Sequence, residues 1–121
     1  MLRLSALALA VLVAVPATAQ DFGGGLAAYN RGDYAGAVKE WRPLAETGHA
    51  KAQFNMAMLY FKGEGVPHDH VTGYMWFRLS LTHGYQGAAQ GIAVASESMT
   101  QAEIAEGEKL AREWLEKRKG K

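Results

Sequence analysis

The stretch that decides the fold is AQFNMAMLYFKGEGVPHD, residues 52–69. Its first half is rich in large apolar residues and lacks glycine and proline, which favours a helix. Its second half brings Gly63, Gly65 and Pro67 close together, so the chain must form a loop there. Asp69 follows the loop and can start another helix by accepting a backbone N–H. The stretch therefore encodes a helix, a loop and the start of a second helix.

The sequence on either side of this stretch approximately repeats itself. Residues 37–48, AVKEWRPLAETG, are echoed by residues 73–84, GYMWFRLSLTHG. Trp41 then corresponds to Phe77, and the offset of about 36 residues lies in the range of stacked helical hairpins. Such hairpins are too thin to bury their apolar faces alone, so they stack around a shared core. The other matched pairs are Gly48 with Gly84, Ala52 with Ala88, and Ala57 with Ala93.

Apolar residues at intervals of three and four predict six helices and no sheet. The expected ranges are about 26–30, 34–46, 50–61, 71–82, 86–97 and 100–117. Gly23 to Gly25 are expected to form a flexible lead-in, because glycine weakens a helix. Thr100 and Glu103 have the spacing of a capping box at the start of the last helix. We expect an all-α fold, a short right-handed α-solenoid of about three antiparallel hairpins.

Small residues at matched positions are expected to let neighbouring helices approach closely. Trp41, Tyr60 and Phe77 are expected to fill the space that these small residues leave. The small residues are Ala37, Ala45, Ala52, Ala57, Ala88 and Ala93.

Residues 1–19 have the features of a signal peptide. Arg3 gives a positive start, residues 4–15 are apolar apart from one serine, and residues 17–19 read Ala-Thr-Ala. The apolar segment has about 12 residues, whereas a membrane-spanning helix takes roughly 20. An uncleaved anchor is the alternative. We expect an exported protein, periplasmic or secreted, with one domain over residues 20–121.

Composition excludes several functional classes. The chain has no cysteine, which excludes disulfides, cysteine nucleophiles and thiolate metal sites. Without Arg3, the 13 basic residues become 12, equal to the 12 acidic ones. A neutral domain has no global attraction for nucleic acid or anionic membrane. We expect no nucleic-acid partner and no membrane insertion after signal cleavage.

The polar residues do not form a constellation that predicts catalysis. His68 and His70 flank Asp69, but their spacing is poor for one helix face and a third ligand is not evident. His49 and His83 lie beside the matched glycines Gly48 and Gly84, at expected helix ends where a cation would suit the helix dipole. The serines lack the G-x-S-x-G elbow of hydrolases. We therefore predict no enzyme, no metal and no cofactor, with a small periplasmic hydrolase as the alternative.

Residues 50–84 resemble a full Sel1-like repeat, of the tetratricopeptide-like superfamily. The resemblance rests on Ala52, Tyr60, the Gly-x-Gly-Val run at 63–66, and Asp69. Met56-Ala57 stands where the family has Leu-Gly, Gly73 where it has alanine, and Phe77 where it has tryptophan. Half or capping repeats flank the full one, with a tetratricopeptide-like turn near residues 29–37 and a capping helix near 99–114. The resemblance implies an exported bacterial scaffold or adaptor.

The resemblance also implies a binding face. In tetratricopeptide repeats the first helix of each hairpin lines the concave face. Transferred to this chain, the expected partner-binding residues are Lys51, Phe54, Asn55, Met58, Phe61 and Lys62.

We therefore predict a non-catalytic binder of a protein or peptide in the cell envelope. Phe54, Met58 and Phe61 would supply an apolar strip, and Lys51 and Asn55 could hold a peptide backbone or carboxylate. Alternatively, Phe54 and Met58 pack on the neighbouring hairpin. A homodimer that covers the third helix is the alternative function.

Overall fold

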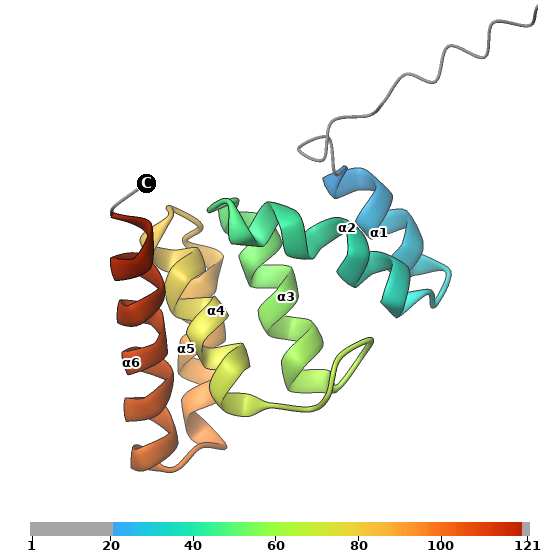
Figure 1. Ribbon diagram of the computed structural model, residues 1–121. Helices are drawn as coiled ribbons and strands as arrows, with labels where there is room; N and C mark the ends of the chain where they lie inside the picture. Colours follow the sequence, from blue (N-terminus) through green and yellow to red (C-terminus); the bar gives the residue numbers. More distant parts are fainter. Residues whose placement is uncertain (1–20, 120–121) are drawn as a thin grey trace, which may run out of the picture.

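The computed structural model describes residues 21–119, which form six helices and no strand (Figure 1). The predicted signal peptide lies outside the described residues. The all-α prediction is confirmed. The helices are α1 (Phe22–Asn30), α2 (Tyr34–Glu46), α3 (Ala50–Lys62), α4 (His70–Thr82), α5 (Gly87–Glu97) and α6 (Gln101–Arg118).

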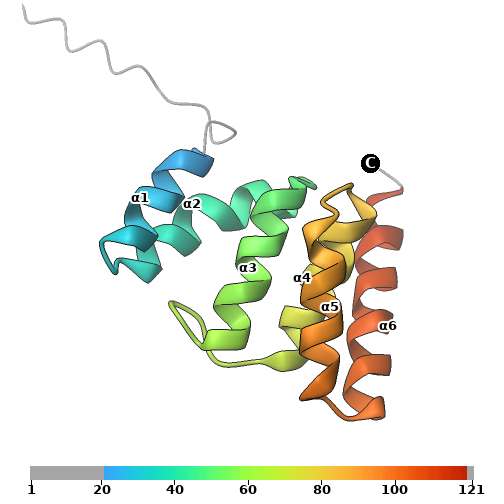
Figure 2. The ribbon, with the colours of Figure 1, turned by 180° about the vertical axis from the view of Figure 1, so that it is seen from behind.

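α1 lies at one end of the molecule and α6 at the other, with α2, α3 and α4 following one another in chain order between them (Figures 1 and 2). α1 packs on α2 and α3 packs on α4, while α2 against α3 joins these two hairpins. This arrangement is the predicted helical solenoid. The last pair differs in detail, because α5 and α6 both pack on α4 rather than mainly on each other. α4 is therefore covered from three sides.

Three predicted helix starts are made by side-chain caps. The carboxylate of Asp33 accepts the Gly36 N–H at 2.9 Å, and that of Asp69 accepts the Thr72 N–H at 3.1 Å. Thr100 accepts the Glu103 N–H at 3.1 Å. The Glu103 carboxylate in turn accepts the Thr100 N–H at 2.9 Å, which completes the capping box.

The prediction of a flexible glycine lead-in is wrong. Gly23 to Gly25 form the first turn of α1, and the Asp21 carboxylate caps it by accepting the Gly23 N–H at 2.9 Å. Gly25 is buried, and a Cβ atom there would collide with the indole of Trp41. The indole N–H donates to the Phe22 carbonyl at 3.1 Å. Close packing on Trp41 thus overrides the weak helix propensity of glycine.

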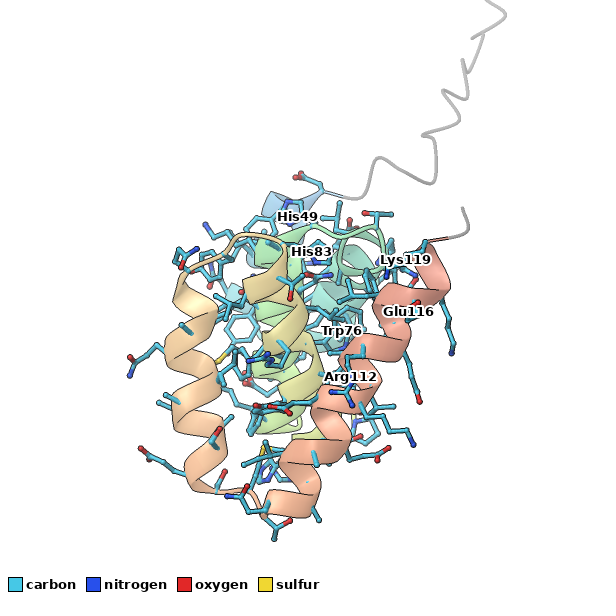
Figure 3. All side chains as sticks on the ribbon, turned by 90° about the vertical axis from the view of Figure 1, so that its left-hand side faces the viewer. His49, Trp76, His83, Arg112, Glu116 and Lys119 are labelled. Carbon is cyan, nitrogen blue, oxygen red and sulfur yellow. The ribbon has the colours of Figure 1, made fainter. Side chains whose placement is uncertain are left out.

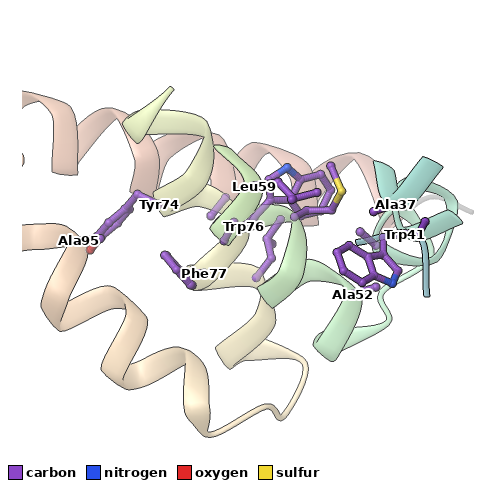
Figure 4. Packing of buried hydrophobic residues seen from close by; sticks show 14 residues of the cluster. Ala37, Trp41, Ala52, Leu59, Tyr74, Trp76, Phe77 and Ala95 are labelled. Carbon is purple, nitrogen blue, oxygen red and sulfur yellow. The ribbon is translucent and has the colours of Figure 1, made fainter. Parts of the chain in front are cut away.

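The core follows the predicted alternation of large and small residues (Figure 4). Trp41 and Phe77 are buried, whereas Tyr60 is half-buried and its hydroxyl accepts from Arg42 at 3.1 Å. Five of the six predicted alanines are buried. Ala93 is exposed, and Ala95 takes the buried position on α5.

Candidate binding groove

α3 divides its residues between the core and an open side. Ala52, Met56, Ala57 and Leu59 are buried. The six residues predicted to bind a partner are all half-buried or exposed. The open side of α3 lies between α1 and α5, and in Figure 2 α5 lies in front of α4 beside α3. We call the surface formed by α1, α3 and α5 the groove face.

The larger of two hollows on the groove face lies between α3 and α5 and encloses about 390 Å³. We call it the α5-side hollow. Phe77 of α4 also lines it. α3 contributes four of the six predicted residues, and α5 closes the other side with Val94 and with small and polar residues. The lining residues are Phe54, Met58, Phe61 and Lys62 of α3, and Gly87, Gln90, Gly91, Val94 and Ala95 of α5, with Ser98 just beyond.

A smaller hollow of about 180 Å³ lies between α3 and α1. We call it the α1-side hollow. It is lined by Asn55, Met58 and Lys62 from the predicted set, and by Leu26 and Tyr29 of α1 on the opposite side, with Trp41 and Leu59 beneath. Met58 and Lys62 therefore lie between the two hollows and line both. The groove face is continuous across α3.

Lys51 is the one predicted residue that lines neither hollow. Its ammonium nitrogen lies 5.4 Å from the centroid of the Phe22 ring, a cation–π contact with the start of α1. Lys51 is exposed and marks one end of α3, while Lys62 marks the other.

Phe54 and Phe61 pack on the neighbouring helix as well as lining the hollow. The Phe54 ring centroid is 5.4 Å from that of Phe77 and 5.0 Å from that of Tyr85. The Phe61 and Phe77 centroids are 5.5 Å apart. One side of each ring therefore packs on α4, the other helix of the same hairpin, while both residues also line the α5-side hollow. That they bind a partner stays a prediction.

Glycines make room for the aromatic rings of this hollow. A Cβ atom at Gly73 would lie 2.5 Å from the Phe61 ring, and one at Gly91 would lie 2.5 Å from the Phe77 ring. Gly73 stands where the family has alanine, and the Phe61 ring occupies the space of the missing methyl group.

The α5 side of the groove was not predicted from the sequence. Gly87, Gly91 and Ala95 recur at intervals of four residues, which places them on one face of a helix. Val94 and Ser98 are also four residues apart from each other. This row of small residues could have indicated that aromatic rings of α3 and α4 approach α5 closely, or that a hollow lies between them.

Large hydrophobic residues that are exposed mark the same face. Within residues 21–119 they are Leu26, 41% exposed, and Val94, 56% exposed. Leu26 lines the α1-side hollow and Val94 lines the α5-side hollow. The large apolar side chains that water reaches most are therefore concentrated at the groove.

Lys62 belongs to a polar cluster at one end of the groove. Its ammonium group donates to the Tyr29 hydroxyl at 3.3 Å and lies 3.8 Å from the Glu64 carboxylate. The Tyr29 hydroxyl donates to Glu64 at 3.2 Å. The hydrogen bond with Glu64 and the charge of Glu64 raise the pKa of Tyr34. The Glu64 carboxylate thus interacts with Lys62, Tyr29 and Tyr34. The Lys62 side chain stays 49% exposed.

A hydrogen-bonded chain joins the two hairpins at the other end of α3. Gln53 is fully buried, and its amide donates to the Ala45 carbonyl at 2.9 Å. The Gln53 amide oxygen lies 2.9 Å from Nδ1 of His83. Figure 3 shows His49 and His83 at this same end of the molecule. At this end, the side-chain amide of Gln53 thus connects α2, α3 and the C-terminus of α4 and has a structural role.

The expectation for His49 is wrong. His49 is the N-cap of α3, and its Nδ1 accepts the Ala52 N–H at 3.1 Å. The ring therefore caps the N-terminus of α3 as a hydrogen-bond acceptor, rather than acting as a cation at a helix C-terminus. His83 does lie at a helix C-terminus, that of α4.

Within residues 21–119, no three His, Asp or Glu side chains gather closely enough to hold a metal ion. His68 and His70 contact each other, with ring centroids 4.4 Å apart, and His70 stacks on Phe61 at 4.8 Å. None of the six helices has the length and hydropathy of a membrane span.

Comparison with known families matches residues 50–85 to the Sel1 repeat. No curated protein matches the chain significantly. The matched segment contains α3, the glycine-containing loop and α4, and thus one wall and the floor of the α5-side hollow. Sel1 repeats are a non-catalytic scaffold type that generally mediates protein–protein interaction. Residues 50–85 of this protein are therefore similar to a Sel1 repeat, and they lie between the α1–α2 hairpin and helices α5 and α6.

Proposed function

We propose that this protein is an exported, non-catalytic adaptor that binds another protein or a peptide through its groove face. The observation that carries the proposal is the coincidence of three features on that face. Both hollows open there, both exposed large hydrophobic residues line them, and α3 of the Sel1 repeat lies between them. Exposed apolar surface beside a preformed hollow is typical of an interaction site.

Export is the part of the proposal that rests on residues 1–19 alone. We place the mature protein in the periplasm, with secretion as the other destination of the same signal. Fractionation of cells that express the full chain, with mass spectrometry of its N-terminus, tests this. A mature chain beginning at Gln20 in the periplasmic fraction supports export, whereas an intact N-terminus in the cytosol contradicts it.

Site-specific photo-crosslinking tests the binding face. Because the chain has no cysteine, Val94→Cys places a single thiol at the rim of the α5-side hollow. Ala105→Cys places the matched control on α6, at another exposed position. Each thiol is labelled with benzophenone maleimide and irradiated in cells that express the full chain.

We expect Val94→Cys to crosslink to a discrete heterologous protein and Ala105→Cys not to do so. Identical products from both positions, or none from Val94→Cys, would contradict the proposed binding face. A product of twice the mass of the chain, formed from Val94→Cys alone, would favour the homodimer instead.

A further inference from the structure

The α5-side hollow has the size and lining of a pocket for bulky apolar side chains. Its volume of about 390 Å³ is near the lower end of the roughly 300–1,000 Å³ typical of ligand pockets. Aromatic rings of Phe54, Phe61 and Phe77 form its floor and one wall. Pockets of this kind receive the anchor side chains that dominate the affinity of protein interfaces.

The floor of the hollow is closely packed rather than loosely filled. Phe77 is 3% exposed, and its ring contacts the rings of Phe54 and Phe61 on one side. On the other side it lies where a Cβ atom of Gly91 would be. These rings have little room to move into the hollow, so an incoming side chain finds a preformed apolar surface and loses little affinity to reorganisation.

α3 carries two charged residues, both lysines, while α1 carries none and α5 carries Glu97 at its C-terminal end. Lys62 is the one charged residue that lines either hollow. Lys51, at the opposite end of α3, forms no salt bridge with any residue between 21 and 119. The two lysines are 11 positions apart, or about 16 Å along a helix. Glu64 lies 3.8 Å from Lys62, but that half-exposed pair leaves ammonium N–H groups free to bind a further acceptor.

A second copy of the chain is a poor fit to this face. A two-fold interface centred on α3 would bring the same surface of both subunits together. Lys51 and Lys62 would then face lysines of the partner copy, and like charges across an interface oppose association. A partner with negative charge beside its apolar anchor complements the face instead.

We propose, on the basis of the binding function above, that the groove binds a peptide segment in which a bulky apolar side chain is flanked by acidic residues. The apolar side chain enters the α5-side hollow, between Met58 and Val94. The carboxylates lie along α3, toward Lys62 and Lys51. The acidic flanks fix the direction of the segment, and the anchor supplies most of the affinity.

Fluorescence anisotropy with defined peptides tests this inference. The probe is a short fluorescein-labelled peptide with adjacent Phe and Leu residues and glutamates on both sides. Matched peptides replace the glutamates with glutamine, replace them with lysine, or replace Phe and Leu with serine. Each is titrated with wild-type mature protein, with the Lys51→Gln, Lys62→Gln double variant, and with a Lys109→Gln, Lys117→Gln control on exposed positions of α6.

We expect the acidic apolar peptide to bind most tightly. Loss of the apolar pair should weaken binding about 10- to 100-fold, which corresponds to the burial of one large side chain. The change from glutamate to glutamine should weaken binding to wild type about fivefold or more. With the Lys51→Gln, Lys62→Gln variant, the acidic and amide peptides should bind alike, while the α6 control should behave as wild type.

Three outcomes would overturn the inference. The lysine peptide could bind as tightly as the glutamate peptide, the preference for glutamate could survive neutralisation of both lysines, or no peptide could bind. If the photo-crosslinks at Val94 persist in any of these cases, the binding function stands and only the chemistry of the partner is wrong. If neither peptide binding nor the photo-crosslinks at Val94 are observed, the proposed function is wrong as well.

Discussion

Trp41 shows how one large side chain determines the conformation of residues far from it in the sequence. Its ring occupies the space beside Gly25 and its indole N–H reaches the Phe22 carbonyl. The sequence pattern predicts a core tryptophan, because Trp41 lies in the apolar stripe of α2. It does not predict that three glycines are helical, because this depends on a contact between residues about 16 positions apart.

Two neighbouring glycines give a matched test of this contact. Gly25→Ala should lower the free energy of unfolding by about 1–3 kcal/mol, because its Cβ atom would overlap the indole. Gly24→Ala meets only ordinary contacts, the nearest at 3.5 Å from the Asp21 Cβ atom, and should leave stability unchanged or raise it by up to about 1 kcal/mol. Urea unfolding followed by circular dichroism measures both. Equal effects of the two changes would show that Gly25 does not pack on Trp41.

The candidate site was predictable at the residue level only where it lies within the segment that matches the Sel1 repeat. Phe54, Met58, Phe61 and Lys62 line the α5-side hollow as expected from the position of α3. Lys51 does not, because its ammonium group lies over the Phe22 ring. The α5 residues were missed since all but Val94 are small or polar. They matter because the rings of α3 and α4 approach them, which the sequence of α5 alone does not reveal.

At the scale of the helices, side-chain caps explain why so many boundaries were predicted correctly. Asp33, Asp69 and Thr100 satisfy backbone N–H groups at three helix starts. These interactions span three residues, so the sequence contains all their partners. The packing of both α5 and α6 on α4 is different in kind. It depends on the combined shapes of three helices and was not predictable from local patterns.

The capping box of α6 should make the helix sensitive to acid. Hydrogen bonds from the backbone N–H and the side chain of Thr100 lower the pKa of Glu103 below its ordinary value. A group with a lowered pKa in the folded state stabilises the protein above its unfolded pKa, which is about 4.3 for glutamate. That contribution is lost as the pH falls through the lower, folded-state pKa.

We therefore expect the Glu103→Gln variant to be less stable than wild type at neutral pH. The difference in stability between the two proteins should shrink as the solution is acidified from about pH 6 to pH 3. Glu106→Gln removes the same charge from an exposed position one turn away and serves as the control. Urea midpoints across this pH range measure the difference. A gap between wild type and Glu103→Gln that stays constant down to pH 3 would contradict the role of the carboxylate in the cap.

At the scale of the whole molecule, the short array explains why the groove face is small and centred on α3. The segment that matches the Sel1 repeat lies between a hairpin on one side and two helices on the other. α1 and α5 therefore each form one wall, and α3 lies between both hollows. A longer array would extend this face repeat by repeat. The affinity for a partner here must come from a few well-packed contacts rather than from a large area.

The central claim is that the groove face, and no other face, receives the partner segment. The most direct test is methyl NMR of the mature protein titrated with the acidic Phe-Leu peptide. Met58 and Val94 line the α5-side hollow, whereas Leu115 lies on α6. We predict that the methyl signals of Met58 and Val94 shift with a common saturation curve while that of Leu115 stays in place. Shifts at Leu115 that match or exceed those at Met58 and Val94 would contradict the account.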